Sequence, residues 1–430
     1  MMNNSDNELY IGEITMKLRR LLLLVMTLTL TPLLTVQPIQ AAELANTNDT
    51  FVHKWTIDQK DFINLNSVYN STKHIGKDGT LYVWQRDRET QDTVVLAIGS
   101  DGRLLWQYSF YAKFFDDTLA EGADGHVFIV SGNETQDDLQ VIQPDGQAAW
   151  EPSALWAQGD FGTKRIGGLY LNEDGSFWIT VFGDVSNSFN YLCKFDVNGS
   201  LLEKHKLPGT VTLFSNGYLV SSFVKSGNEN GGYSAFRMYE WSGNETLYYA
   251  PERYESADLR LLEDGKTILH SSKPPGELTA ENTSNAEQQI VVYEDGVPLW
   301  SLSLAKGSRA RLITMGNDIY YHDSSGVLNK INNQTGEVQA SFMPEGELVS
   351  EAYLGEKKSN RLYPDDINSS LQVLTMNSKR QSLNRYLLEP QSLQPQLKFN
   401  TSYQYLGRGY FLQDRNDKLE LYHHALSDSQ

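Results

Sequence analysis

The sequence predicts an all-β protein built from one repeating unit, and three observations support this. A tight Asp-Gly turn is followed, four residues after its glycine, by a tryptophan at three places. A second Asp-Gly or Asn-Gly turn recurs at positions 78, 124, 174, 216 and 264, before short apolar runs. Apart from the N-terminus, no long stretch has the helical period. Repeats of about 42–50 residues are typical of propeller blades, so we expect a single β-propeller. The turn-and-tryptophan pairs are Gly102 with Trp106, Gly146 with Trp150, and Gly296 with Trp300.

Each repeat is predicted to hold four strands, A to D, joined by a tight turn, a variable loop and a second tight turn. Because Asp-Gly and Asn-Gly accept positive φ, the turns are expected to be two-residue hairpin loops. Strands B, C and D of the first repeat are expected at 81–86, 94–98 and 104–110. Those of the sixth are expected at 319–322, 327–331 and 338–342, and those of the seventh at 360–363, 371–376 and 383–388.

The last repeat, with strands at 410–413 and 419–423, lacks a fourth strand. The run Phe51–Ile57 resembles a D strand and is expected to pair beside 419–423 and close the ring. Closure removes exposed sheet edges, which invite aggregation. We therefore expect eight four-stranded blades. Seven blades, or a chain of two or three β-sandwich domains, are the alternatives.

The glycine and tryptophan spacing resembles the repeat of the pyrroloquinoline-quinone-type β-propellers. The match is specific at Gly102/Trp106, Gly146/Trp150 and Gly296/Trp300, while Ala340, Glu203 and Leu247 stand where other repeats would have tryptophan. In that superfamily the tryptophan packs between neighbouring blades, which implies a structural role. Family members that use the quinone as a cofactor are usually larger, and many have adjacent cysteines, whereas this chain has one. The resemblance therefore implies a non-catalytic branch.

The N-terminal residues 1–41 have the features of a secretory signal peptide. A basic cluster at Lys17–Arg20 precedes an apolar core and a small-residue cleavage site ending at Ala41. Met16 stands just before this cluster, so residues 1–15 are either a long leader or an untranslated stretch. We expect cleavage, a short linker at 42–50, and a propeller domain over 51–430 in a secreted or cell-envelope protein of bacterial type. An uncleaved membrane anchor is the alternative.

The composition limits the classes of partner that we expect this protein to bind. The formal net charge is −18, which disfavours nucleic acid and anionic membranes. The single cysteine, Cys193, excludes an intramolecular disulfide and is expected in a buried strand. We expect a monomer that binds an extracellular or envelope protein or a glycan, without contact to the membrane after signal cleavage.

The variable B–C loops are predicted to share one face with the blade-to-blade crossings, and binding surfaces in such folds lie on the variable face. The first residues of the A strands should line the central channel there. A mixture of carboxylates and cationic side chains suits a polar ligand: a glycan, a peptide segment, or Ca²⁺ held by Asp116 and Asp117. The candidate ligand-binding residues are Asp116, Asp117, Lys164, Arg165, Asp258, Arg309 and Arg311, with Glu347 as a further charged residue at this face.

No catalytic or zinc-binding motif is present in the sequence. Asp137-Asp138 and Asp365-Asp366 are interpreted as solvated loop pairs. His423 and His424 should point to opposite faces of a strand, so they cannot easily share a metal.

The sequence therefore predicts a non-catalytic binding protein, with no cofactor beyond possible Ca²⁺. Two alternatives stay open. One is an enzyme acting on extracellular polysaccharide with carboxylates in the channel, and the other is a quinone-dependent dehydrogenase.

Overall fold

The structure is a computed structural model, and all residues that it describes belong to the compact unit Pro38–Gln430. The predicted signal peptide (1–41) and linker (42–50) lie outside them. The described residues are 51–58, 72–86, 92–112, 114–133, 135–152, 154–161, 163–183, 189–225, 232–252, 255–273, 285–304, 311–322, 325–344, 347–354, 362–363, 371–377, 382–400, 402–415 and 418–424.

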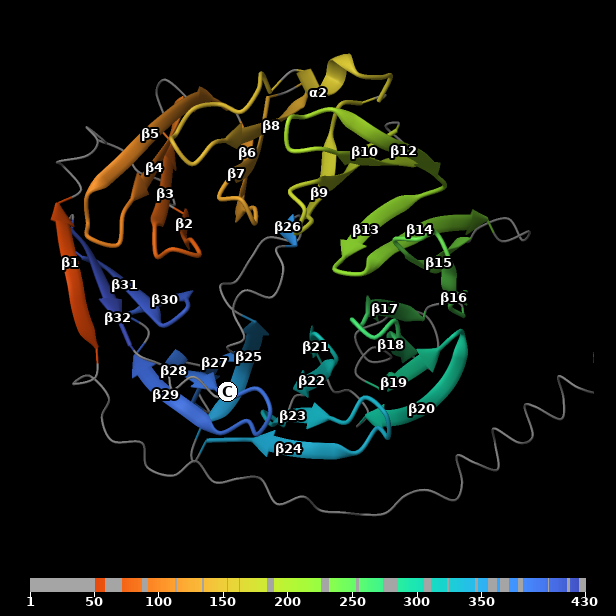
Figure 1. Cartoon of the computed structure of the whole chain (residues 1–430). Helices are drawn as coiled ribbons and strands as arrows, with labels where there is room; N and C mark the ends of the chain where they lie inside the picture. Colours follow the sequence, from red (N-terminus) through yellow and green to blue (C-terminus); the bar gives the residue numbers. More distant parts are fainter. Residues whose placement is uncertain are drawn as a thin grey trace, which may run out of the picture. The chain divides into compact units, whose positions relative to one another are not determined.

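The strands form eight antiparallel sheets arranged in a ring as the blades of a β-propeller (Figure 1). The fold class and the count of eight are thus confirmed. Blade 1 contains β2 (Thr72–Ile75), β3 (Leu81–Arg86), β4 (Asp92–Ile98) and β5 (Leu104–Tyr111); blade 2 contains β6 (Phe114–Glu121), β7 (Val127–Gly132) and β8 (Asp137–Ile142); blade 3 contains β9 (Ile166–Leu171), β10 (Phe177–Phe182), β11 (Asn190–Phe195) and β12 (Leu201–Leu207); blade 4 contains β13 (Thr210–Phe214), β14 (Gly217–Lys225), β15 (Gly232–Glu240) and β16 (Glu245–Tyr249).

The second half of the ring follows the same plan, with strand A innermost and strand D outermost. Blade 5 contains β17 (Ser256–Leu261), β18 (Thr267–Lys273), β19 (Glu287–Glu294) and β20 (Val297–Leu304); blade 6 contains β21 (Arg311–Met315), β22 (Asp318–His322), β23 (Leu328–Ile331) and β24 (Val338–Phe342); blade 7 contains β25 (Leu348–Leu354), β27 (Leu371–Met376), β28 (Ser382–Leu388) and β29 (Pro395–Asn400); blade 8 contains β30 (Gln404–Gly407), β31 (Tyr410–Arg415), β32 (Lys418–His423) and β1 (Val52–Asp58).

The N-terminal strand closes the ring as predicted. β1 pairs antiparallel with β32, with Val52 opposite His423 and Asp58 opposite Lys418. The first described strand of the chain thereby becomes the D strand of the last blade. Its Trp55 takes the position that Trp106 has in blade 1.

Two blades differ from the prediction. In blade 2 the D strand stops after one bridge, Ile142 to Ala148. The chain then reaches Pro152, which cannot donate a ladder hydrogen bond, and enters the short helix α2 (Ala154–Ala157). In blade 7 the prediction placed each strand one letter too late in the A to D order. The run 371–376 is strand B rather than strand C, and strand D is 395–400. The predicted strand at 360–363 corresponds to β26 (Leu362–Tyr363), which pairs parallel with β9 of blade 3.

The recurrent Asp-Gly turns are mostly three-residue loops, so the predicted two-residue form was wrong. At Gly99–Arg103, Gly99 N–H donates to Arg103 O and Gly102 N–H to Gly99 O, each at 2.8 Å. Only Gly102 has positive φ (82°), as in a type I turn followed by a bulge glycine. The aspartate is selected because its carboxylate accepts the amide two residues on; Asp101 does so from Arg103 at 3.0 Å. The Asp295-Gly296 turn alone among these matches the prediction, with φ of 49° and 73°.

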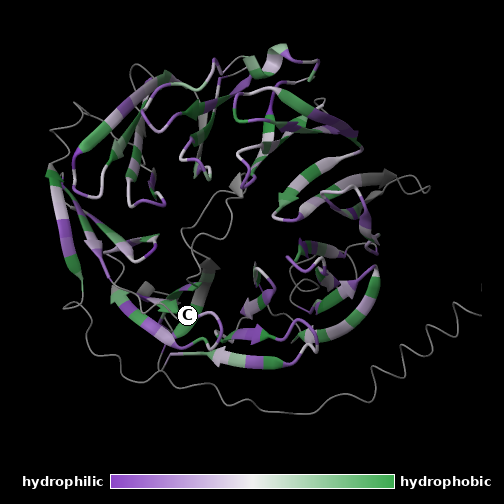
Figure 2. Cartoon of the chain, viewed as in Figure 1, coloured by the Kyte–Doolittle hydropathy of each residue, from purple (hydrophilic) through white to green (hydrophobic). Residues whose placement is uncertain are grey.

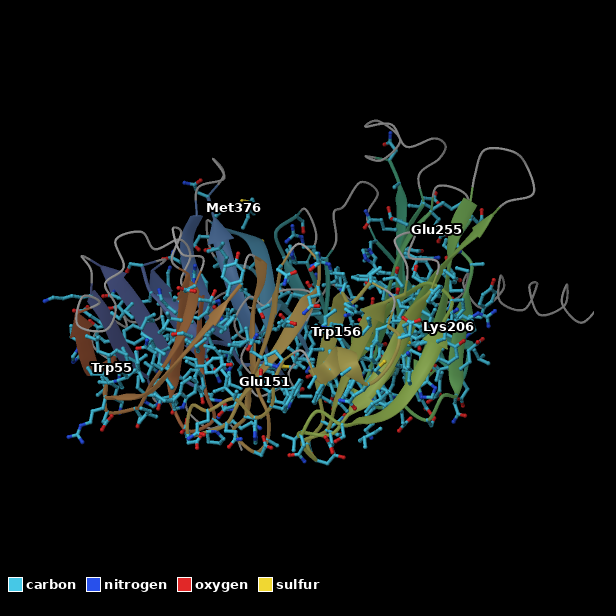
Figure 3. The ribbon with its side chains drawn as sticks, turned by 90° about the horizontal axis from the view of Figure 1, so that it is seen from above. Trp55, Glu151, Trp156, Lys206, Glu255 and Met376 are labelled. Atoms are coloured by element: carbon cyan, nitrogen blue, oxygen red, sulfur yellow. The ribbon has the colours of Figure 1, made fainter. Side chains whose placement is uncertain are left out.

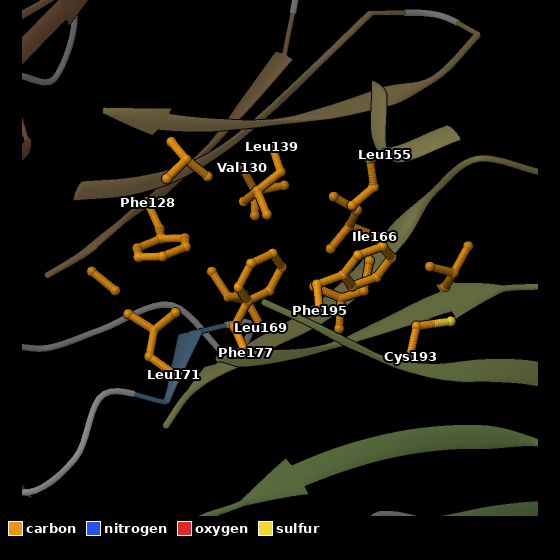
Figure 4. Packing of buried hydrophobic residues seen from close by; sticks show 14 of the residues in the cluster. Phe128, Val130, Leu139, Leu155, Ile166, Leu169, Leu171, Phe177, Cys193 and Phe195 are labelled. Carbon is orange, nitrogen blue, oxygen red and sulfur yellow. The ribbon is translucent and has the colours of Figure 1, made fainter. Parts of the chain in front are cut away.

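The core lies between neighbouring blades, where the faces of adjacent sheets meet. Hydrophobic and hydrophilic residues alternate along the outer strand β20 (Figure 2). Between blades 2 and 3, Phe128 packs edge-on against Phe177, which stacks on Phe195 (Figure 4). Cys193 is fully buried in this cluster, as predicted, and burial raises the pKa of its thiol to about 12.

Two tryptophans of the repeat make hydrogen bonds to the next blade. Trp150 donates its indole N–H to Val197 O at 3.2 Å, and Trp300 donates to Asn333 O at 2.9 Å. Both acceptors belong to the C–D turn of the following blade. This contact supports the structural role that the resemblance implied.

Candidate functional site

The two faces of the ring differ in the connections they carry. Because the strands within each blade are antiparallel, the B–C and D–A connections meet on one face, here called the loop face. The A–B and C–D turns meet on the other, the turn face. In the side view, Glu255 and Met376 lie toward the loop face and Glu151 toward the turn face (Figure 3). Among the described candidates, Lys164, Arg165, Asp258 and Arg311 lie at or near the starts of A strands and so belong to the loop face.

On blades 2 and 3, Arg165 is held by Asp137. Arg165 Nη1 lies 2.7 Å from Asp137 Oδ1 and donates to Asn133 O at 2.9 Å. The second carboxylate oxygen of Asp137 accepts the amide of Ile166 at 2.9 Å. The positive charge of Arg165 is therefore neutralised in a contact between blades.

The backbone of Asp137 takes part in the same contact. Its N–H donates to the carbonyl of Lys164 at 2.9 Å, and its carbonyl accepts the indole N–H of Trp156 at 2.7 Å. The side chain of Asp137 is only 12% exposed, so its interpretation as a solvated loop residue was wrong. Asp138 is also partly buried, and burial raises the pKa of its carboxyl group.

On blade 5, Asp258 and Arg260 form an ion pair on the innermost strand β17. Asp258 Oδ2 lies 3.1 Å from Arg260 Nη2, with side chains 46% and 35% exposed. In register, Asp258 lies opposite His270 of β18. The His270 ring nitrogen Nε2 is 3.3 Å from Gln288 Oε1, and burial lowers the pKa of this imidazole. We call Asp258, Arg260, His270 and Gln288 the Asp258 cluster.

The cluster offers several kinds of hydrogen-bonding group side by side. Asp258 can accept hydrogen bonds, Arg260 can donate them, and His270 stays neutral near pH 7 because its pKa is lowered. This combination suits hydroxyl and amide groups of a polar ligand. The half-exposed ion pair is accessible to solvent.

Two further charged groups on the loop face are engaged within the fold. Glu347 accepts hydrogen bonds from Thr375 and Asn384 and lies 3.4 Å from Lys398 Nζ, so it ties three strands of blade 7 together. Lys273, where the long connection to β19 begins, pairs with Glu252 at 2.5 Å.

For the remaining candidate residues the structure gives fewer contacts or no side-chain position. Lys164 is exposed and has positive φ (50°), and Arg311 is exposed at the start of β21. Asp116 and Asp117 belong to β6, but their side chains lie outside the described residues, as do Arg309 and Asp365-Asp366. The structure thus brings Lys164 and Arg165 together on blade 3 and places Asp258 separately on blade 5.

Residues that sequence reasoning missed are those that hold the candidates in place. Asp137, Trp156, His270 and Gln288 form no local motif. The contacts of Asp137 and Trp156 come from tertiary packing, and strand register places His270 and Gln288 near Asp258. Within the described ranges, no three His, Cys, Asp or Glu side chains gather as metal ligands would. The described residues also contain no helix long and apolar enough to cross a membrane.

Comparisons with known proteins give similar solved structures but no family. No protein-family profile and no curated protein matches the chain. Among solved structures, the computationally designed Ika8 protein has 12% identity over 84% of this chain and 98% of its own, with a TM-score of 0.46. The β-propeller domain of the Trilobed protease from Pyrococcus furiosus has 11% identity, coverage of 76% and 94%, and a TM-score of 0.43. BamB from Moraxella catarrhalis has 10% identity, coverage of 87% and 99%, and a TM-score of 0.37. At these values the likeness says nothing about ligand or partner.

Proposed function

We propose that this chain is an exported, non-catalytic β-propeller that binds an extracellular or envelope protein or a glycan through its loop face. The Asp258 cluster carries this proposal. It presents a half-exposed carboxylate and guanidinium on the innermost strand, beside a neutral imidazole and an amide. Polar groups that converge at one point of a rigid scaffold are characteristic of ligand sites.

The turn face supports the assignment by contrast. Several aspartate carboxylates are used locally there, because they accept an amide of their own turn, as Asp78 does from Thr80 at 2.9 Å and Asp174 from Ser176 at 2.9 Å. On the loop face the connections vary in length, and such segments tolerate the variation that recognition needs.

The experiment uses the chain from Ala42 onward, immobilised and exposed to envelope extract, culture medium and purified polysaccharide of the host. Retention should fall at least tenfold in the double variant Asp258→Asn with Arg260→Gln. It should also fall when 273–288 is replaced by a short turn. The double variant Asp101→Asn with Arg103→Gln, which removes the same two kinds of charge from an ion pair on the turn face, should bind like the wild type.

Unchanged retention after both loop-face changes would exclude this site. Degradation of the polysaccharide, rather than its retention, would support the enzymatic alternative.

A further inference from the structure

The outer strand β5 of blade 1 differs from the other D strands of the ring. Its sequence, LLWQYSFY, has eight residues without a charge or a proline. Natural edge strands are protected from pairing with other chains by charge, proline or short length. The other D strands each have one of these features: Lys204 in β12, Lys398 in β29, Lys54 in β1, Pro298 in β20, and only five residues in β16 and β24.

Apolar side chains are exposed along this edge. Leu105 is 57% exposed and Tyr111 61% exposed, and between them Gln107 and Ser109 also face solvent. The opposite row, Trp106, Tyr108 and Phe110, packs toward blade 2 and stays half-buried.

Blade 2 leaves room beside this row. Its own D strand ends after the bridge from Ile142 to Ala148, so no fourth strand runs next to β5. Tyr108 is held by a hydrogen bond of 3.2 Å to Gln140 Oε1 of β8. Tyr108 thus anchors the half-buried row to blade 2, while among the described residues only β4 pairs with β5.

Polar and apolar side chains are arranged symmetrically about Tyr108 in β5. An antiparallel pairing of two β5 strands centred on Tyr108 places Gln107 opposite Ser109, Trp106 opposite Phe110 and Leu105 opposite Tyr111. Polar residues then meet polar ones and apolar residues meet apolar ones, as favourable cross-strand pairs require. A two-fold interface needs such self-complementarity.

The net charge of the protein also favours β5 as the place where two copies meet. Two copies that each have a formal net charge of −18 repel one another. The repulsion is smallest where a long edge has no charge, which is the case at β5.

We propose that two copies of this chain associate through antiparallel pairing of their β5 strands, forming a continuous sheet from blade 1 of one copy to blade 1 of the other. This inference is independent of the proposed loop-face function and replaces the expected monomer by a reversible dimer. The pairing involves about seven residues a side, which is less than a standard interface provides, so the dimer should dissociate on dilution.

The test is sedimentation equilibrium of the chain from Ala42 onward over a thousandfold range of concentration. The wild type should approach twice the monomer mass at the highest concentrations. Gln107→Lys and Gln107→Glu should each remain monomeric, because the two copies of residue 107 are diagonal neighbours across the two-fold axis.

An equimolar mixture of these two variants should restore the dimer, which a merely misfolded variant could not do. Ser301→Lys, on the exposed row of β20, is the matched control and should dimerise like the wild type.

A wild type that is monomeric throughout would overturn the proposal, as would a dimer that Gln107→Lys leaves intact. Protection of the 105–111 amides from hydrogen exchange only when host envelope extract is added would assign the edge to another protein and equally overturn self-pairing.

Discussion

The indole of Trp106 lies on Gly146 of the next blade so closely that a Cβ added to the glycine would be 2.5 Å from Trp106 Cβ. The same relationship joins Trp55 to Gly102, Trp150 to Gly199 and Trp300 to Gly336. Glycine therefore has two functions at these turns. It accepts the positive φ of the bulge position, and it leaves space for the preceding blade's tryptophan.

Substituting these glycines should separate the two effects. Gly146→Ala should lower the free energy of unfolding by roughly 2–4 kcal/mol, because left-handed backbone strain and overpacking each contribute about 1–3 kcal/mol. Gly243 has the same φ of 86° but no atom within 4 Å of its added Cβ. Gly243→Ala should therefore cost only the backbone term, about 1 kcal/mol. Parallel urea titrations compare the two, and equal losses would show that the tryptophan contact adds nothing.

Where the tryptophan is missing, the next blade supplies the bulk instead. Glu203 of blade 3 stands at the tryptophan position, and Trp241 from the turn of blade 4 stacks on Trp178 of blade 3 at 4.8 Å. Ala340 of blade 6 is small, and Leu393 from the turn of blade 7 packs in its cluster, 1% exposed. At these two positions the bulky side chain comes from the following blade instead of the preceding one, and it fills the space between the two blades.

Leu393 provides a second test, because it has positive φ (56°) in addition to being buried. Leu393→Ala should lower the unfolding free energy by about 2–5 kcal/mol through the cavity it leaves. Leu393→Gly leaves a similar cavity but relieves the strained backbone, so it should be about 1 kcal/mol more stable than Leu393→Ala. Chemical denaturation measures the order, and the reverse order would contradict the role of the backbone.

The sequence predicted the elements that depend on local turn chemistry. Asp-Gly turns and the run at 51–57 were enough for eight blades and for ring closure. Blade 7 was misassigned because the sequence 355–370, between its A and B strands, has no Asp-Gly or Asn-Gly pair to mark the boundary. The D strand of blade 2 was expected from Trp150, but Pro152 and helix α2 divert the chain soon after it.

The candidate site was predicted less well, for a physical reason. Arg165 and Asp137 were assigned to different environments, although their side chains are paired at 2.7 Å. Sequence spacing cannot reveal a contact between blades, because it depends on how two sheets pack. Asp258 was found because it begins an A strand, but His270 and Gln288 become its neighbours only through the register of β17, β18 and β19.

The N-terminal strand should be required for the stability of the whole ring. Deleting 51–58 exposes the edge of β32 and removes Trp55 from Gly102, so we expect a lower melting temperature and aggregation on heating. A circular permutant that joins residue 424 to residue 51 through a short linker, and opens the chain between 58 and 72, should keep wild-type stability. Melting followed by circular dichroism and light scattering tests both. A deletion variant as stable as the wild type would show that closure is dispensable.

The closing seam should also make stability depend on pH. His423 packs on Tyr410, with ring centroids 4.8 Å apart, and His424 lies 5.9 Å from Phe51 of the N-terminal segment. Burial lowers the pKa of both imidazoles, with smaller effects of Lys54 on His423 and of His423 on His424. The unfolded chain then binds more protons than the folded chain as pH falls through about 6.5. Stability from these groups is therefore complete above that pH and declines below it.

Melting temperatures measured from pH 8 to pH 5 should fall more steeply for the wild type than for the double variant His423→Phe with His424→Phe, which keeps aromatic rings at the seam but cannot be protonated. His205 lies on β12 of blade 3, away from the closing seam, and 52% of its side chain is exposed. His205→Gln should therefore follow the wild-type pH dependence. A double variant whose melting temperature falls as steeply as that of the wild type would place the acid sensitivity outside the closing seam.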